Sequence, residues 1–152
     1  MSQALAPVMD PAFRERITAL EDSIRAELPL VELPVQHFFI PGCYARALYL
    51  PAGTVATGKI HKHPQISILA QGDISVLTED GMRRVQAPFV LVSPPGVKRA
   101  VYAHTDSTWI TVHRTDETDV EKVEAELVAT SFAEYDEFVR LTSQEAPCLS
   151  QQ

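Results

Sequence analysis

The sequence predicts an all-β core, folded as a small barrel, with helices at both ends. Short apolar runs recur between residues 44 and 113, and turn signals such as Gln71-Gly72-Asp73 and Glu79-Asp80-Gly81 separate them. The stretches on either side of this region instead carry apolar residues at helical spacing. The chain has 152 residues, of which 45 % are hydrophobic and 22 % are charged, a composition typical of one globular domain.

The first 34 residues are expected to form a helix followed by an extended arm. Asp10 can cap this helix, and Pro11 suits its first turn. Prolines at positions 29, 34 and 41 then favour an extended chain up to a strand over 44–50. The apolar stripe of the helix, over 11–28, consists of Phe13, Ile17, Leu20, Ile24 and Leu28.

The barrel itself is predicted over 35–116. The glycines at 72 and 81 mark points where we expect the chain to reverse, with Asp80-Gly81 as a type I′ turn. After the strand at 44–50, further strands are expected at 55–61, 66–70, 74–78, 83–86, 89–92, 97–102 and 108–113.

Two more helices are expected over 117–142, followed by a flexible tail over 143–152. Val120, Val123 and Leu127 mark one face of the first helix, at 119–128. The second helix, at 131–141, opens with Ser131-x-x-Glu134, the pattern of a capping box.

Charge and composition disfavour several classes of function. The chain has 13 Lys and Arg against 20 Asp and Glu, and its formal net charge of -7 argues against a nucleic-acid partner. The sequence has no signal-peptide pattern and no run of about 18 apolar residues, so we expect a cytoplasmic protein with no membrane partner. Cys43 and Cys148 show neither metal-binding nor disulfide spacing and are expected to be reduced thiols.

His61 and His63 are the leading candidates for a binding site. Residues two apart in a strand project to the same face, so both imidazoles are expected to point into the barrel. Two aligned imidazoles are half of a typical metal site. The alternative is that both are hydrogen-bonded polar residues near the mouth of the barrel, without a metal.

Two motifs occur between residue 44 and residue 113, Gly58…His61-x-His63…Gly72 and Pro94-Pro95-Gly96. With these motifs the region resembles the cupin superfamily. That resemblance implies a double-stranded β-helix, or jelly roll, that is commonly dimeric, with His61 and His63 as metal ligands.

A narrower similarity is to uncharacterised cupin-like proteins of tailed phages and prophages. It covers the runs 72–81, 95–99 and 102–104. This similarity implies no known activity.

Two positions differ from the ligand set that the cupin resemblance implies. Gln65 is the only side chain near the expected position of a glutamate, and Arg99 stands where the second motif has a histidine. His113, on the last predicted strand, and His104, before it, are the replacement candidates. The predicted metal ligands are therefore His61, His63, His113 and His104, and it stays open whether they hold a divalent metal (zinc, iron, manganese or nickel) or none.

Arg99 indicates a different kind of ligand. A guanidinium inside a barrel can bind a carboxylate or phosphate through two parallel hydrogen bonds, so Arg99, Gln65 and Tyr102 are candidate ligand-binding residues. The alternative is that Arg99 forms a buried pair with an acid such as Asp106 or Glu79.

Two functions follow as hypotheses. The missing glutamate and the replaced histidine favour a cupin-like barrel of phage type, a non-catalytic structural or accessory protein, virion-associated, with a degenerate histidine-based pocket. The other hypothesis is a metal-dependent small-molecule-binding cupin or enzyme that uses His61 and His63. Under the first, we expect a homo-oligomer, dimeric or higher, assembled through helix 11–28 or helix 131–141. Other phage structural proteins are further candidate partners, and the location is then the host cytoplasm or the virion.

Overall fold

The barrel strands pair antiparallel and are nested around a single hairpin. The computed structural model describes residues 9–145. The central hairpin consists of β6 (Asp73–Thr78) and β7 (Gly81–Gln86), and outside it β5 (Gln65–Gln71) pairs with β8 (Phe89–Ser93). Next come β3 (Val55–Thr57) with β9 (Ala100–Ala103), and then β2 (Cys43–Leu50) with β10 (Ser107–Arg114). The first half of the barrel sequence therefore pairs with the second half along its length, and the paired strands curl into a barrel.

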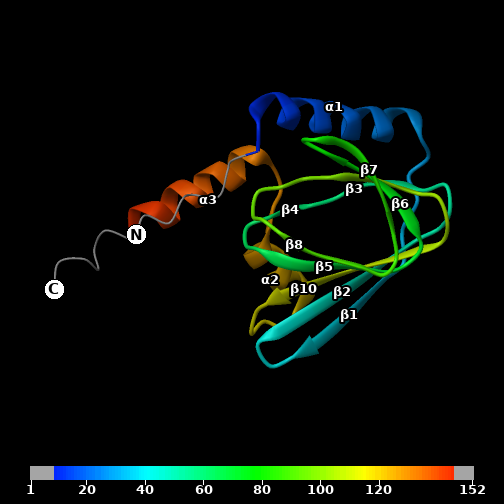
Figure 1. The fold of residues 1–152 in the computed structure, drawn as a ribbon. Coiled ribbons are helices and arrows are strands. Elements are labelled where there is room, and N and C mark those ends of the chain that lie inside the picture. Colours follow the sequence, from blue (N-terminus) through cyan, green and yellow to red (C-terminus); the bar gives the residue numbers. More distant parts are fainter. Residues whose placement is uncertain (1–8, 146–152) are drawn as a thin grey trace.

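These strands form two sheets that face each other (Figure 1). Sheet A has the order β1-β2-β10-β5-β8, in which β1 (Val35–Ile40) is an edge strand, and sheet B has the order β3-β9-β6-β7. Nested pairs distributed over two facing sheets define a jelly roll. The predicted all-β core, a jelly-roll barrel with helices at both ends, is confirmed.

Most predicted strands are present, with small shifts at their ends. The sequence did not predict β1, because the prolines that flank it indicated an extended chain without strand pairing before residue 44. The strand predicted at 55–61 is two short strands, β3 and β4 (Ile60–His61), and Gly58 lies between them, where its N–H donates to the carbonyl of Arg99 over 2.7 Å. The strand predicted from residue 97 begins only at Ala100, since its partner β3 ends at Thr57.

The turns at Gly72 and Gly81 differ from the prediction. At Gly72 the chain does not reverse, because β5 in sheet A continues into β6 in sheet B, and the glycine forms the corner between the sheets. In the β6–β7 hairpin Thr78 pairs with Gly81, so the turn residues are Glu79 and Asp80. Neither has a positive φ, which a type I′ turn requires, so that assignment is wrong.

Helix α1 (Pro11–Glu27) lies against the outer side of sheet B (Figure 1). Its N-cap is Asp10, as predicted, and the Asp10 carboxylate accepts a hydrogen bond from the N–H of Ala12. Phe13 and Ile17 are buried in one cluster with Ala100 of β9. The first part of the apolar stripe is therefore covered by the helix's own barrel, whereas Leu28, at the C-cap, is 48 % exposed.

The C-terminal part contains α2 (Val120–Leu127), the short strand β11 (Val128–Ala129) and α3 (Phe132–Glu145). The hydroxyl of Ser131 accepts the N–H of Glu134 over 3.1 Å, whereas the Glu134 carboxylate accepts the N–H of Thr130, one residue before the position that a capping box requires. Helix α3 continues past the predicted end at residue 141, and 146–152, with Cys148, lie outside the described residues. None of the helices within residues 9–145 has the length and apolarity to cross a membrane.

Apolar side chains fill one end of the space between the two sheets. Both sheets contribute to this core, and Trp109 of β10 packs against it. Polar side chains line the other end of the interior. The buried members of the core are Leu50, Leu69, Ile74, Val76, Val85 and Ala103.

We predict that Gly72→Ala destabilises the fold far more than Gly53→Ala. Both glycines have positive φ, +107° and +83°, which costs another residue about 1 kcal/mol. A Cβ on Gly72 would lie only 2.7 Å from the Cα of Ser107, whereas a Cβ on Gly53 would meet nothing within 4 Å. Urea unfolding should therefore give an additional loss of about 2 kcal/mol for Gly72→Ala. Equal losses in the two variants would contradict the tight packing at this corner.

Candidate functional site

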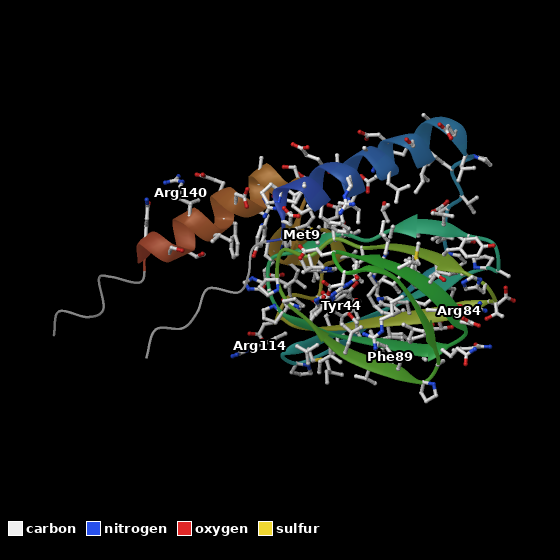
Figure 2. All side chains as sticks on the ribbon, turned by 45° about the horizontal axis from the view of Figure 1, so that its top comes forward. Met9, Tyr44, Arg84, Phe89, Arg114 and Arg140 are labelled. Atoms are coloured by element: carbon white, nitrogen blue, oxygen red, sulfur yellow. The ribbon has the colours of Figure 1, made fainter. Side chains whose placement is uncertain are left out.

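A cavity of about 120 Å³ lies between the two sheets, next to the apolar core. It is amphipathic, because its lining changes from polar to apolar along the barrel. Figure 2 shows Tyr44 inside the barrel, with Arg84 and Arg114 at opposite ends of it. The apolar part of the lining includes Leu48, Leu50, Val76, Val101 and Trp109.

The polarity gradient follows from the alternation of side chains along the strands of sheet A. In β2, the inward residues change from Tyr44 and Arg46 to Leu48. On the antiparallel neighbour β10, Thr111 is paired with Arg46 and Trp109 with Leu48. Polar side chains therefore lie beside polar ones, and apolar side chains beside apolar ones. The register of the sheet therefore collects the polar side chains at one end.

Strand β5 contributes Gln65 and Ser67 to the same polar end. Both residues are buried, and Ser67 is paired with Thr111 across the sheet. The Oε1 atom of Gln65 and the Oγ atom of Ser67 have no hydrogen-bond partner among the described residues. Buried polar atoms normally have partners, so these two are available to a molecule inside the cavity.

His61 is held at the cavity wall by backbone hydrogen bonds on both sides. It is the last residue of β4, which pairs with β11. The carbonyl of His61 accepts the N–H of Gly96 over 2.9 Å, and the N–H of Lys62 donates to the carbonyl of Leu127 over 2.8 Å. The Pro94-Pro95-Gly96 turn thus contributes to the site by fixing the strand that carries His61.

His63 does not project into the cavity beside His61, which corrects the expectation from the two-residue spacing. Strand β4 ends at His61, and the chain bends before β5 starts at Gln65. The exposed ring of His63 packs edge-on against Phe138 of α3, with 5.5 Å between the ring centres. The period of two holds only within a continuous strand, and Pro64, which lacks an N–H, follows the bend.

His113 takes the place next to His61 instead. It projects inward from β10, and the centres of the two imidazole rings are 5.1 Å apart. The Tyr44 ring stacks on the other side of His113 at 5.8 Å, and Phe39 stacks on Tyr44 at 4.9 Å. The rings of His61, His113 and Tyr44 line the polar end of the cavity, and Phe39 packs on Tyr44 outside the lining.

Burial keeps both cavity histidines neutral. Desolvation, with a smaller contribution from neighbouring positive groups, lowers the pKa of His61 to about 3. Desolvation and the charge of Arg46 lower the pKa of His113 to about 4. The Nε2 atom of His113 lies 3.0 Å from the hydroxyl of Thr111.

Arg99 lies at the polar end, and no acid in the described part of the chain forms a salt bridge with it. Its guanidinium donates to the hydroxyl of Ser93 over 2.7 Å, and burial lowers the pKa of Arg99. Neither acid suggested by the sequence reaches it, because Asp106 accepts the N–H of Ala52 and Glu79 accepts the N–H of Asp10.

Arg46 is a second guanidinium in the cavity lining, and within residues 9–145 neither it nor Arg99 forms a salt bridge. Two positive charges therefore share the polar end with no acid bound to either of them.

Helix α2 covers the polar end of the cavity. Val123 and Leu127 pack on the ring of Tyr44, and Glu124 of the same helix forms a salt bridge with Lys59 at the edge of the lining. Glu124 is the only carboxylate in the lining among the described residues.

The remaining predicted site residues are divided between the cavity and the outside. Gln65 lies in the lining, as described above. Tyr102 is 40 % exposed and packs edge-on against His104, whose Nε2 atom lies 2.6 Å from the hydroxyl of Ser75. Tyr102 and His104 are therefore together, but they are not part of the cavity lining.

The donors around the cavity supply two of the ligands of a divalent metal site, and a third is not grouped with them among the described residues. In the part of the chain that the structure describes, no three His, Cys, Asp or Glu side chains are grouped so that they could hold one ion. His61 and His113 supply two imidazoles, and the charges nearest to them include Arg46, Arg99 and Lys59. A metal site in a protein usually takes at least three ligands, and positive neighbours oppose a dication.

Sequence reasoning missed Arg46, Ser67, Ser93 and Thr111 as cavity residues. A signal was present, because Ser67 and Thr111 stand between apolar residues in Ile66-Ser67-Ile68 and Ile110-Thr111-Val112. That pattern places either the polar or the apolar residues inside, and the usual assumption is that the apolar ones are buried.

No protein-family model matches the chain, and no curated protein matches it. Several solved structures with a similar fold are described as cupins. A cupin superfamily protein from Desulfitobacterium hafniense DCB-2 is 11 % identical with a TM-score of 0.48, over 59 % of this chain and 84 % of that one. KdgF from Halomonas sp. is 23 % identical, with a TM-score of 0.48, over 61 % and 90 %. An RmlC-like cupin from Shewanella frigidimarina NCIMB 400 is 19 % identical, with a TM-score of 0.47, over 59 % and 80 %. We transfer no ligand or activity from these similarities.

We predict that the protein loses stability on acidification below pH 6.5. An imidazole in the unfolded chain has a pKa near 6.5, whereas those of His61 and His113 are about 3 and about 4 in the fold, so unfolding takes up protons between these values. The free energy of unfolding should fall by up to about 1.4 kcal/mol per pH unit for each of the two histidines. Urea unfolding at about pH 7.5, 6.5 and 5.5 measures this slope before most carboxylates protonate.

The double variant His61→Gln/His113→Gln should flatten the slope. His63→Gln is the matched control, because it removes an exposed imidazole outside the cavity. A slope that is unchanged in the double variant, or lost in the control, would contradict the assignment to the buried pair.

Proposed function

We propose that this protein is a non-catalytic binding protein that holds a small amphipathic carboxylate inside its jelly roll. The observation that carries the proposal is Arg99, a half-buried guanidinium in the cavity that has no acidic partner among residues 9–145. A charge removed from water without a counterion destabilises the fold. A bound carboxylate would supply the missing negative charge and, through two hydrogen bonds, match the geometry of the guanidinium.

The surroundings of Arg99 support an anion. Arg46 adds a second positive charge to the same end of the cavity, and the histidines there are neutral, so the end carries a net positive charge. The unpartnered Oγ of Ser67 is a further hydrogen-bond donor for an oxyanion. The chain as a whole carries a net charge of -7. The excess of positive charge is therefore a local feature of this end of the cavity.

The other end of the cavity supports an apolar tail on the ligand. Leu48, Leu50 and Trp109 line it and offer no charged group. A cavity of 150 Å³ in another protein takes a benzene molecule, so about 120 Å³ suits a ligand of about five or six non-hydrogen atoms. A monocarboxylate of three or four carbons has this size.

The chemistry of the lining supports binding over catalysis. A general base works best with a pKa near the working pH, and histidines with pKa values of about 3 and 4 are too weakly basic for that role. Among the described residues, the one carboxylate in the lining is that of Glu124, and it forms a salt bridge with Lys59. The structural or accessory role suggested by the phage resemblance is compatible with this proposal, since an occupied barrel can still serve as a scaffold.

A divalent metal at His61 is the alternative to the carboxylate. The stacked pair His61 and His113 favours it, because neutral imidazoles are the metal-binding form. Elemental analysis of protein purified without chelator separates the two proposals. One equivalent of bound metal that is lost in His61→Ala would overturn the carboxylate proposal.

We predict that the wild-type protein binds straight-chain monocarboxylates with an optimum at three or four carbons. Isothermal titration calorimetry with the series from acetate to octanoate measures this optimum. Arg99→Met should weaken binding at least about 100-fold, because a buried hydrogen-bonded charge pair contributes several kcal/mol. The control is Arg84→Met, since Arg84 forms an exposed pair with Asp73 at another part of the barrel. Equal affinity in wild type and Arg99→Met would reject the proposed anion site.

We also predict that Arg99→Met stabilises the ligand-free protein. The substitution replaces a partly desolvated, unpaired charge with an apolar side chain of similar length, which should raise the free energy of unfolding by about 1 kcal/mol. Thermal and urea unfolding measure the change. A loss of stability would indicate that Arg99 is needed for the fold and would argue against a residue kept for binding.

A further inference from the structure

Gln65 holds a buried hydrogen-bond acceptor that a simple carboxylate in the cavity would leave without a partner. The residue is 7 % exposed, and its Oε1 atom has no hydrogen-bond partner among the described residues. An amide oxygen can only accept hydrogen bonds, and the same is true of both oxygens of an ionised carboxylate. A carboxylate can therefore bind Arg99 and accept from the hydroxyl of Ser67, but it has no hydrogen to donate to Gln65.

This unpartnered acceptor destabilises the fold unless a donor reaches it. A buried polar atom without a hydrogen bond loses its hydration on folding and gains no compensating interaction. An apolar side chain of similar length, such as methionine, would fill the position of Gln65 without that loss. A donor carried by the ligand would supply the interaction that the chain itself does not provide at this oxygen.

The register of sheet A places the acceptor beside the expected position of the carboxylate. Gln65 of β5 is paired with Ser93 of β8. The hydroxyl of Ser93 accepts a hydrogen bond from the guanidinium of Arg99 over 2.7 Å, so the guanidinium is held near the amide. The carbon atom next to a carboxylate bound to Arg99 therefore lies close to Gln65.

The same strand defines the direction in which the rest of the ligand extends. On the inward face of β5, Ser67 follows Gln65, and it is paired with Thr111 of β10. The next inward pair along these strands is Leu69 with Trp109, and both side chains are apolar. An apolar tail therefore extends past Ser67 toward Trp109, while a substituent on the second carbon of the ligand stays beside Gln65.

We infer that the ligand is a 2-hydroxy monocarboxylate, whose hydroxyl donates to Gln65 while its carboxylate binds Arg99. This inference rests on the proposed function, because it names the class of carboxylate that the same cavity takes. A hydroxyl on the second carbon supplies the donor for Gln65 and leaves the hydroxyl of Ser67 free to donate to the carboxylate. The three-carbon member, 2-hydroxypropanoate, has the size that a cavity of about 120 Å³ admits.

The cavity disfavours related acids that carry a different group on the second carbon. A 2-oxo acid adds a carbonyl, which accepts hydrogen bonds and cannot donate to Gln65. A 2-amino acid adds an ammonium group, which can donate, but Arg46 and Arg99 oppose a further positive charge at this end. The carboxylate of Glu124 does not offset that charge, because it forms a salt bridge with Lys59.

Three different contacts also make the site selective for one enantiomer. The carboxylate of the ligand meets Arg99, its hydroxyl meets Gln65, and its tail points toward Trp109, and these residues come from three separate segments of the chain. Only one enantiomer of a 2-hydroxy acid can place all three groups at the same time. We expect that enantiomer to bind at least about tenfold more tightly, since the other one leaves Gln65 without its hydrogen bond.

Isothermal titration calorimetry on the wild type at about pH 7.5, where these acids are ionised, tests the inference. The ligands are propanoate, the two enantiomers of 2-hydroxypropanoate, and 2-oxopropanoate. The better enantiomer should bind at least about tenfold more tightly than propanoate, because its hydroxyl gives a partner to a buried acceptor. The oxo acid should bind no more tightly than propanoate.

Gln65→Met should abolish the preference for the hydroxyl and leave the affinity for propanoate within about threefold of that of the wild type, because it removes only the acceptor. The variant is expected to fold, since an apolar group replaces a buried polar atom that has no partner among the described residues. Gln86→Met is the matched control. Gln86 is exposed on β7 and donates to Asp73 outside the cavity, so this control should keep the wild-type preference.

The possible outcomes distinguish this inference from the proposed function. A wild type that binds propanoate and gains no affinity from the hydroxyl in either enantiomer would overturn the inference and leave the carboxylate site in place. Tighter binding of 2-oxopropanoate would show that the amide presents its N–H to the ligand, and it would also overturn the inference. A preference that persists in Gln65→Met would assign the hydroxyl to another group. Binding of none of these acids would overturn the proposed function and the inference together.

Discussion

The cavity and the apolar outer face of sheet A both depend on one constraint, the two-residue alternation of side chains along antiparallel strands. Because Ser67 and Thr111 face inward, their neighbours Ile66, Ile68, Ile110 and Val112 must face outward. A one-residue slip in register would bury the isoleucines and valines and expose the serine and threonine. The nested strand pairing prevents that slip, since each strand of sheet A between the edges is bonded on both sides. A polar, positively charged end of the interior and an apolar outer face of sheet A are thus two consequences of a single arrangement.

This arrangement reduces the stability that the barrel could have. At the polar end of the interior, Arg99 has no acidic partner among the described residues, and the Oε1 atom of Gln65 and the Oγ atom of Ser67 have no hydrogen-bond partner there. These groups lose their hydration on folding without full compensation. The opposite end compensates with a core built around Leu50, Leu69 and Ile74. Helix α1 adds a second apolar cluster on the outside of sheet B. The interior is thus divided into an apolar end that stabilises the fold and a polar end that does not. Such a division is typical of proteins that retain a site at the expense of stability.

Most of the fold could be predicted from the sequence because the signals that specify it are local. Helix caps at Asp10 and Ser131 and apolar runs broken by glycines depend on neighbours along the chain, and these elements are found where they were expected. The site was predicted less well. His61, Gln65 and Arg99 do line the cavity, and His113 joins them, but His63 lies outside. The reason is physical, since a spacing of two residues predicts a shared face only if the strand continues, and β4 ends at His61.

The sequence by itself determined that the chain forms an all-β barrel with helices at both ends, because alternation, helical periodicity and capping act over a few residues. Only the tertiary structure decided which side of sheet A faces inward. A polar residue between two apolar ones is compatible with either face, and the choice depends on how strands far apart in the sequence pair and which surface the helices cover. The same long-range pairing brought His113 and Arg46 to His61 and left His63 against α3. The residue types in the sequence identified the candidate site residues, and the pairing of distant strands determined which of them lie together in the cavity.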